Sequence, residues 1–174
     1  MRMKKGLFFL SILLVSSLQA QVKWMNVSDA VSKQKEQPKK ILMMIYKEPC
    51  EVCGDMEQNT FSHPVIENQI NEGFYPVKYN ASDLSVLKLY GQDFNLKPQV
   101  NGFNEFASYM NVTAAPTIIF LDESGSVITK LQGKLSAKEL EPYLGFISQD
   151  SHRKITNRAQ WSDFQKKFKS KIRD

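Results

Sequence analysis

An apolar run that ends just before a pair of cysteines is the feature that most constrains how this chain can fold. Ile41 to Tyr46 form an unbroken apolar run, which predicts a central β-strand covered on both faces. Cys50-Glu51-Val52-Cys53 follows almost at once and holds the only two cysteines among the 174 residues. An amphipathic segment then continues through Met56 to Phe61. The pattern predicts two sulfur atoms at the junction of a buried strand and a helix.

The spacing of the two cysteines favours thiol chemistry. Residues three apart share a helix face, so the two sulfurs are within reach of a small disulfide ring. Unpaired N–H groups at the helix N-terminus stabilise a thiolate at Cys50. Such a thiolate attacks a partner's disulfide, and Cys53 then resolves the mixed disulfide. We therefore predict Cys50 as nucleophile and Cys53 as resolving residue, with a redox-active Cys50–Cys53 disulfide and no other cofactor or metal.

Two other interpretations of the cysteine pair stay open. The disulfide could be inert, in a binding or scaffold protein. The pair could also belong to a copper-handling chaperone that uses Met43, Met44 or Met56, because soft sulfur ligands suit Cu(I). Met43 and Met44, however, belong to the apolar run predicted to form a buried strand, where methionine is more often a packing residue.

A second signal is Ala114-Ala115-Pro116-Thr117, which directly precedes the apolar run Thr117 to Leu121. A proline that opens a strand beside a reactive site is a candidate for a cis peptide bond. Such a bond would leave the backbone of Ala115 free to pair with an extended substrate strand. Ala115 and Pro116 are therefore predicted substrate-binding residues.

The remaining elements predict an α/β sandwich with a mixed central sheet flanked by helices. We expect a helix over residues 29–36 capped by Ser28, a break or kink at His63-Pro64 followed by helical spacing over 65–70, a strand over 74–79, and a helix from Ser82 to about Gly91. A loop and a short helix from about Asn101 should follow, then a hairpin of 117–121 with 127–129. The last core helix begins with a Ser136–Glu139 capping box and must kink or restart at Pro142. His63, beside Pro64, is interpreted as a capping or surface residue.

The first twenty residues have the layout of a secretory signal peptide. Basic residues up to Lys5 precede the apolar stretch from Leu7 to Val15, and cleavage is expected after Ala20. The apolar stretch is short for a membrane span. This predicts a periplasmic or secreted protein.

The net charge of +5 belongs to the two ends of the chain. Residues 153–174 carry a net +6, whereas residues 21–152 carry a net −4. A nucleic-acid enzyme should place its positive charge on the folded surface, so we set nucleic-acid binding aside.

The C-terminal segment repeats an apolar spacing at Trp161, Phe164, Phe168 and Ile172. This is one stripe of an amphipathic helix whose other face is rich in lysine. An exposed aromatic stripe would be costly, which favours packing on the core over partner docking. The lysine face is expected to be solvated, with weak attraction to a membrane surface as the minor interpretation.

From Ile41 to Ile147 the chain resembles the thioredoxin superfamily, with Cys50–Cys53 as the redox motif and Pro116 as the cis-proline. Gly133 sits where that family keeps a glycine after its last strand. The patterns at 24–30, 61–64 and 161–165 are similar to exported thioredoxin-like proteins of the Bacteroidetes type, in the thioredoxin-7 and DUF255-like families.

The resemblance implies a thioredoxin fold over residues 21–148, after a signal peptide over 1–20 and before a basic helical extension over 149–174. It implies a thiol–disulfide oxidoreductase that acts on protein disulfides or dithiols. A membrane electron donor is a further candidate partner, and a monomer is expected.

The departures from the family concern mechanism. Pro49 stands where thioredoxins usually carry tryptophan, and it is a predicted substrate-binding residue. Met44 replaces a buried acid that helps to deprotonate the second cysteine, unless Glu48 or Glu51 substitutes for it. Glu51 also opposes a thiolate at Cys50. A less stabilised thiolate favours the disulfide form, so we expect a reductase or isomerase rather than a primary oxidant.

Overall fold

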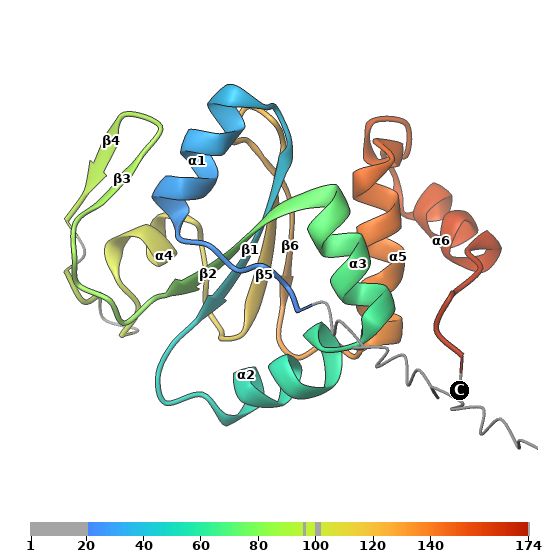
Figure 1. Cartoon of the computed structure of the whole chain (residues 1–174), viewed down its shortest axis with the longest axis horizontal. Coiled ribbons are helices and arrows are strands. Elements are labelled where there is room, and N and C mark those ends of the chain that lie inside the picture. Colours follow the sequence, from blue (N-terminus) through green and yellow to red (C-terminus); the bar gives the residue numbers. More distant parts are fainter. Residues whose placement is uncertain (1–20, 96, 100–101, 174) are drawn as a thin grey trace, which may run out of the picture.

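The structure is a computed structural model that describes residues 21–95, 97–99 and 102–173. The predicted signal peptide lies outside these residues. The helices are α1 (Val27–Glu36), α2 (Glu51–Met56), the π-helical η1 (Glu57–Phe61), α3 (Pro64–Gly73), α4 (Glu105–Tyr109), α5 (Ala137–Ser148), the 3-10 turn η2 (Ser151–Arg153) and α6 (Arg158–Lys167). The strands are β1 (Lys40–Tyr46), β2 (Phe74–Asn80), β3 (Leu87–Leu89), β4 (Gln92–Phe94), β5 (Thr117–Leu121) and β6 (Val127–Gln132). Figure 1 shows their arrangement.

The main sheet has the order β2-β1-β5-β6. β1 pairs with β2 in parallel and with β5 antiparallel, and β5 and β6 form an antiparallel pair. The predicted mixed α/β sheet is confirmed, with the apolar run 41–46 as one of its two central strands. A central strand needs apolar residues on both faces, which explains why this run does not alternate.

Successive residues of β1 point into two separate cores. Ile41, Met43 and Ile45 belong to a cluster with residues of α1 and α4. Leu42 and Met44 belong to the opposite cluster, which residues of α2, α3 and α5 complete. The side chains of all five strand residues are at most 1% exposed. The strand that leads to the cysteines is therefore fixed from both sides.

The helix starts follow side-chain capping. Ser136 and Glu139 form the predicted capping box of α5, and α5 continues through Pro142 as one helix. The cap of α1 is Asn26, whose side chain accepts the N–H of Asp29, so the prediction of Ser28 was wrong by two residues. His63 caps α3 by accepting the N–H of Val65, which confirms its interpretation as a capping residue.

The predicted helix from Ser82 to Gly91 is wrong, because this segment contains a short hairpin. β3 and β4 pair antiparallel across Tyr90 and Gly91, which both have positive φ angles, 49° and 81°. Two positive φ values in a two-residue loop match the twist of a tight hairpin. The helix expected from about Asn101 begins instead at Glu105, with Asn104 as its cap.

The C-terminal extension packs against α5, outside the sheet (Figure 1). Trp161 lies 4.8 Å from both Tyr143 and Phe146 between ring centroids, and Phe164 lies 5.0 Å from Phe146. Packing of the aromatic stripe on the core is confirmed. The stripe is not one helix, however, since α6 ends at Lys167 and Phe168 is its extended C-cap. None of the helices in the described part of the chain has the length and apolarity needed to cross a membrane.

Candidate redox site

The two cysteines lie where the chain passes from β1 into α2. Cys50 is the N-cap of α2, and Cys53 sits in its first turn. A disulfide joins them, with their Cα atoms 5.3 Å apart. The strand-to-helix junction predicted from the sequence is thus the position of the sulfur pair.

The two sulfurs have different surroundings. Cys50 is partly exposed, whereas Cys53 is 3% exposed and belongs to the core cluster between α2, α3 and α5. The backbone N–H of Cys53 donates to the Cys50 sulfur at 3.2 Å. A donor at the helix N-terminus stabilises negative charge on that sulfur. Cys50 is thus the more exposed of the two cysteines, and its sulfur accepts a hydrogen bond at a helix N-terminus.

Ala115 and Pro116 lie at the same end of the sheet. β1 and β5 are antiparallel, with Ile45 opposite Thr117, so the end of β1 lies beside the beginning of β5. The Ala115–Pro116 peptide bond is cis. Cys50 and Ala115 both pack against the cluster that contains Cys53. Within the described residues, no hydrogen bond engages the backbone of Ala115.

The remaining predicted site residues are exposed around Cys50. Glu48, Pro49 and Glu51 are all solvent-exposed. The Glu48–Pro49 bond is also cis, and it was not predicted from the sequence. Pro49 immediately precedes Cys50 and offers an apolar surface beside it. The exposed carboxylates of Glu48 and Glu51 add negative charge near the partly exposed sulfur.

An ion pair that the sequence analysis missed lies one helical turn beyond Cys53. Glu57 follows Cys53 by four residues, and its N–H donates to the Cys53 carbonyl. Its carboxylate lies 2.6 Å from the ammonium of Lys78, which stands in register with Met44 across β1 and β2. The same ammonium lies 5.0 Å from the ring centroid of Tyr46. The spacing of four residues was the available sequence signal, since it places two side chains on one helix face.

A second ion pair fixes α2 to the loop after β6. The Asp55 carboxylate lies 2.5 Å from the ammonium of Lys134 and accepts from Asn59 at 2.9 Å. The Lys134 hydrogen bond, followed by that of Asn59, holds the pKa of Asp55 below its usual value. Since Lys134 follows the β6 end at Gln132 by two residues, this exposed ion pair links α2 to the loop after β6.

The methionines considered for copper binding are packing residues. Met43, Met44 and Met56 are all 0% exposed, and they are divided between the two core clusters. Among the described residues there is no group of three or more His, Cys, Asp or Glu side chains that could hold a metal ion. No observation favours the copper interpretation.

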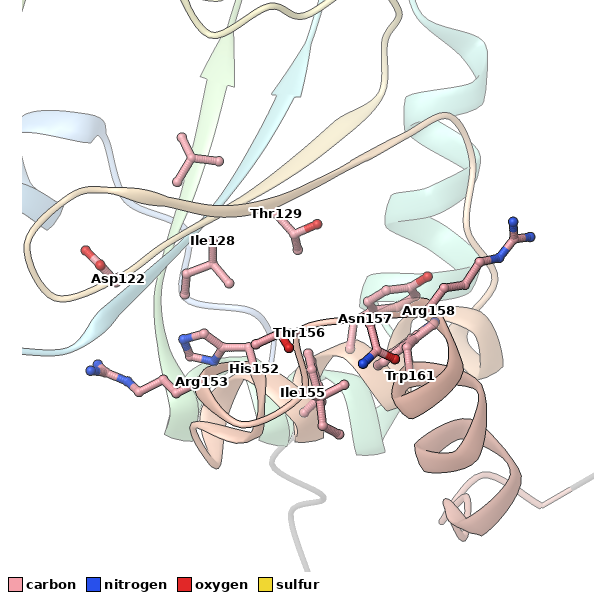
Figure 2. Close-up of a pocket in the computed structure, with 13 residues that line it drawn as sticks. Asp122, Ile128, Thr129, His152, Arg153, Ile155, Thr156, Asn157, Arg158 and Trp161 are labelled. Carbon is pink, nitrogen blue, oxygen red and sulfur yellow. The ribbon is translucent and has the colours of Figure 1, made fainter.

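A groove of about 690 Å³ lies away from the disulfide, between β6, α5 and the C-terminal extension. Figure 2 shows Ile128 and Thr129 on one side and His152, Thr156 and Trp161 on the other. None of the predicted redox or substrate residues lines this groove. It is the seam left where the extension packs on the domain.

Fold and site together define a thioredoxin-fold protein that carries a cysteine pair at a helix N-terminus. Residues 27–148 match the sequence profile of the family described as "Thioredoxin-like domain". The match covers more than half of the chain, and the chain belongs to this family.

Similar proteins agree with that assignment. The chain is 24% identical over 121 residues to the "Thiol:disulfide interchange protein DsbD" of Pectobacterium atrosepticum, covering 68% of this chain and 18% of that protein. It thus spans less than a fifth of the length of this curated relative.

Solved structures show the same fold. A thioredoxin-fold protein from Helicobacter pylori superposes with a TM-score of 0.59 at 16% identity, covering 84% of this chain and 87% of the other. A thioredoxin from Thermus thermophilus gives a TM-score of 0.55 at 17% identity, with coverages of 73% and 87%.

Proposed function

We propose that this protein is a thiol–disulfide oxidoreductase that exchanges disulfides with protein substrates. The observation that carries the proposal is the difference between the two sulfurs of one disulfide. Cys50 is partly exposed and accepts a hydrogen bond at a helix N-terminus, whereas Cys53 is buried behind it. The thioredoxin-like family and the interchange protein among its relatives support the same activity.

The proposed reaction has two exchange steps. In the reduced protein, the Cys50 thiolate attacks one sulfur of a substrate disulfide, and the other substrate sulfur leaves as a thiolate that takes up a proton. Cys53, once deprotonated, attacks the Cys50 sulfur and releases the second substrate sulfur. The substrate gains two electrons and two protons as a dithiol, while Cys50 and Cys53 become the observed disulfide.

Ala115 and Pro116 are proposed to hold the substrate. Their position beside the end of β1 and the unengaged backbone of Ala115 would let an extended peptide pair there. The exposed Pro49 adds an apolar contact next to Cys50. Backbone pairing gives affinity with little sequence preference, which suits an enzyme that acts on disulfides in different proteins.

Glu57 is proposed as the general base for Cys53, in place of the missing acid at Met44. Glu48 and Glu51 are exposed at the protein surface, whereas Glu57 is partly buried, lies on the helix one turn after Cys53 and is held by Lys78. A carboxylate there can accept the Cys53 proton, directly or through water, during the second exchange step. It acts through Cys53 and needs no contact with substrate.

We propose that the protein works as a reductase or isomerase. Glu48 and Glu51 place two negative charges near Cys50 and disfavour its thiolate, which shifts the couple toward the disulfide form. The signal-peptide pattern of residues 1–20 supports export to the periplasm or beyond. Such a reductase needs an electron donor, and a membrane-embedded donor would supply electrons across the bilayer.

The test is the reduction potential of the Cys50–Cys53 couple, measured by equilibration with glutathione. A potential below that of the glutathione couple is expected for a reductase. A potential far above it would contradict the assigned direction. A disulfide that never exchanges, together with unchanged partner binding by a Cys50→Ser variant, would establish the scaffold interpretation instead.

A further inference from the structure

The end of the C-terminal extension presents a row of cations to solvent. Residues 166–173 contain five basic side chains and no acidic one, and all five are exposed. We call these five residues the cationic strip: Lys166, Lys167, Lys169, Lys171 and Arg173. Among ion pairs between described residues, the strip takes part in one exposed contact, from Lys166 to Asp163 at 3.9 Å.

The strip is held in place by the residues that alternate with it. The ring of Phe168 lies against Gly145 of α5. Ile172 is 9% exposed and belongs to the core cluster between α3 and α5. Because alternate residues are turned inward, Lys167, Lys169, Lys171 and Arg173 are left on the outer side.

A buried carboxylate completes this attachment. Glu141 of α5 is 0% exposed. It accepts a hydrogen bond from the hydroxyl of Ser170 and another from the backbone N–H of Lys171 at 2.7 Å. A buried carboxylate without such donors would be costly, so the segment and α5 stabilise each other. The cations are therefore presented by a fixed backbone, which lowers the entropy lost on binding.

The chemistry of the strip fits a flat anionic surface. Trp161 and Phe164 are turned to Tyr143 and Phe146, so the strip offers charge without an apolar anchor. The folded body carries a net −4 over residues 21–152, whereas residues 153–174 carry +6. Because of this charge separation, the C-terminal segment is the part of the molecule that is attracted to a negatively charged surface. Clusters of four to eight basic residues bind anionic lipid surfaces.

We propose that the cationic strip docks this protein on the anionic phospholipid headgroups of a membrane surface. The strip and the β3–β4 hairpin lie on opposite sides of the domain (Figure 1), and α2 with the cysteine pair belongs to a third part of the surface. Docking through the strip therefore leaves Cys50 accessible. The proposal concerns a surface separate from the redox site and stands independently of the redox function.

The test is co-sedimentation of the full chain with vesicles of phosphatidylglycerol in phosphatidylcholine, and with vesicles of phosphatidylcholine alone. Binding is expected only to the anionic vesicles, and it should weaken strongly as salt screens the charges. Comparison with neutral vesicles separates the strip from any apolar contribution of residues 1–20.

Two variants with the same loss of charge locate the surface. The strip variant carries Lys167→Gln, Lys169→Gln, Lys171→Gln and Arg173→Gln. The control variant carries Lys23→Gln, Lys33→Gln, Lys35→Gln and Lys97→Gln, all at exposed positions elsewhere. We expect the strip variant to lose more than about tenfold in affinity for anionic vesicles, and the control variant to lose much less.

Several results would overturn the proposal. These are equal binding to neutral vesicles, equal losses in the two variants, or tighter binding to soluble polyglutamate than to vesicles of matched charge. A third variant with Lys167→Arg, Lys169→Arg and Lys171→Arg keeps the charge and should keep the binding. Far-ultraviolet circular dichroism of every variant verifies that a loss of binding does not come from unfolding.

Discussion

The backbone N–H of Cys53 points at the sulfur of Cys50, 3.2 Å away. The buried Cys53 thus donates a hydrogen bond to the partly exposed Cys50. This donor belongs to the first turn of α2, whose N-cap is Cys50. A negative charge on Cys50 is stabilised by a fixed dipole, whereas Cys53 lies in an apolar cluster that disfavours its thiolate.

This asymmetry predicts opposite behaviour of the two single cysteine variants. Cys53→Ser retains the attacking thiolate but has no resolving residue, so it should accumulate a mixed disulfide with a protein or model disulfide. Cys50→Ser keeps only the buried thiol and should form almost none. Non-reducing electrophoresis after acid quenching measures both. Equal trapping by the two variants would contradict the assignment of the nucleophile.

Glu57 provides a test of the second exchange step. Glu57→Gln should slow release of the mixed disulfide by about tenfold or more, because a carboxylate one turn from Cys53 no longer accepts its proton. The attack by Cys50 should be little affected. Rapid-quench kinetics as a function of pH separates the two steps.

The matched control is Glu72→Gln, which removes an exposed carboxylate on α3. A merely structural role of Glu57 would change stability without changing the pH profile of resolution. Lys78→Met releases Glu57 from its ion partner at 2.6 Å and should alter the same profile. If neither Glu57→Gln nor Lys78→Met alters that profile, another group takes the Cys53 proton.

The sequence was sufficient for the features that depend on local pattern. The apolar run 41–46 indicates a central strand because a strand covered on both faces needs apolar residues at successive positions. Cys50 and Cys53 lie at its end because the run stops there, and the Ser136–Glu139 capping box is a purely local signal. These features need no knowledge of distant contacts.

The wrong or missing predictions concern segments whose structure depends on residues distant in the sequence. The segment 82–91 was assigned to a helix, but Leu87 and Leu89 turn inward in a short strand whose loop residue Tyr90 donates to Gln34 of α1. The Glu57–Lys78 pair joins residues 21 positions apart, so no local window contains it. The anchoring of Ser170 by the buried Glu141 is likewise a contact between distant segments.

The ring contacts between α5 and α6 allow a prediction of how strongly the extension stabilises the fold. Trp161→Ala removes ring contacts at 4.8 Å to both Tyr143 and Phe146. The side chain is half-buried, so we expect a loss of about 1–2 kcal/mol in the free energy of unfolding. Urea titration followed by circular dichroism measures this loss, with the exposed Gln165→Ala on the same helix as control. A change no larger than that of the control would show that the extension is held by Glu141 and Ile172 instead.

Because Tyr79 is buried, we predict that the free energy of unfolding falls at alkaline pH. Its phenol accepts a hydrogen bond from the buried Asn104 at 2.7 Å. Burial, helped by the nearby Asp83 and opposed by the Asn104 bond, raises the pKa of Tyr79 to about 12, from about 10 in the unfolded chain. A raised pKa in the folded state means that the neutral phenol is favoured there. The corresponding stability is complete below about pH 10 and is lost as the pH rises toward about 12.

A Tyr79→Phe variant isolates this contribution from those of all other groups in the protein. The variant keeps the ring that packs 4.9 Å from Phe106, but it leaves the Asn104 amide without one acceptor. It should be less stable than the parent near neutral pH, and the difference should shrink by about 2 kcal/mol by about pH 12 as only the parent ionises. Urea unfolding of both proteins along that pH range gives the two curves. Parallel curves would mean that Tyr79 ionises equally easily in the folded and unfolded chains, and would contradict the rise in its pKa on burial.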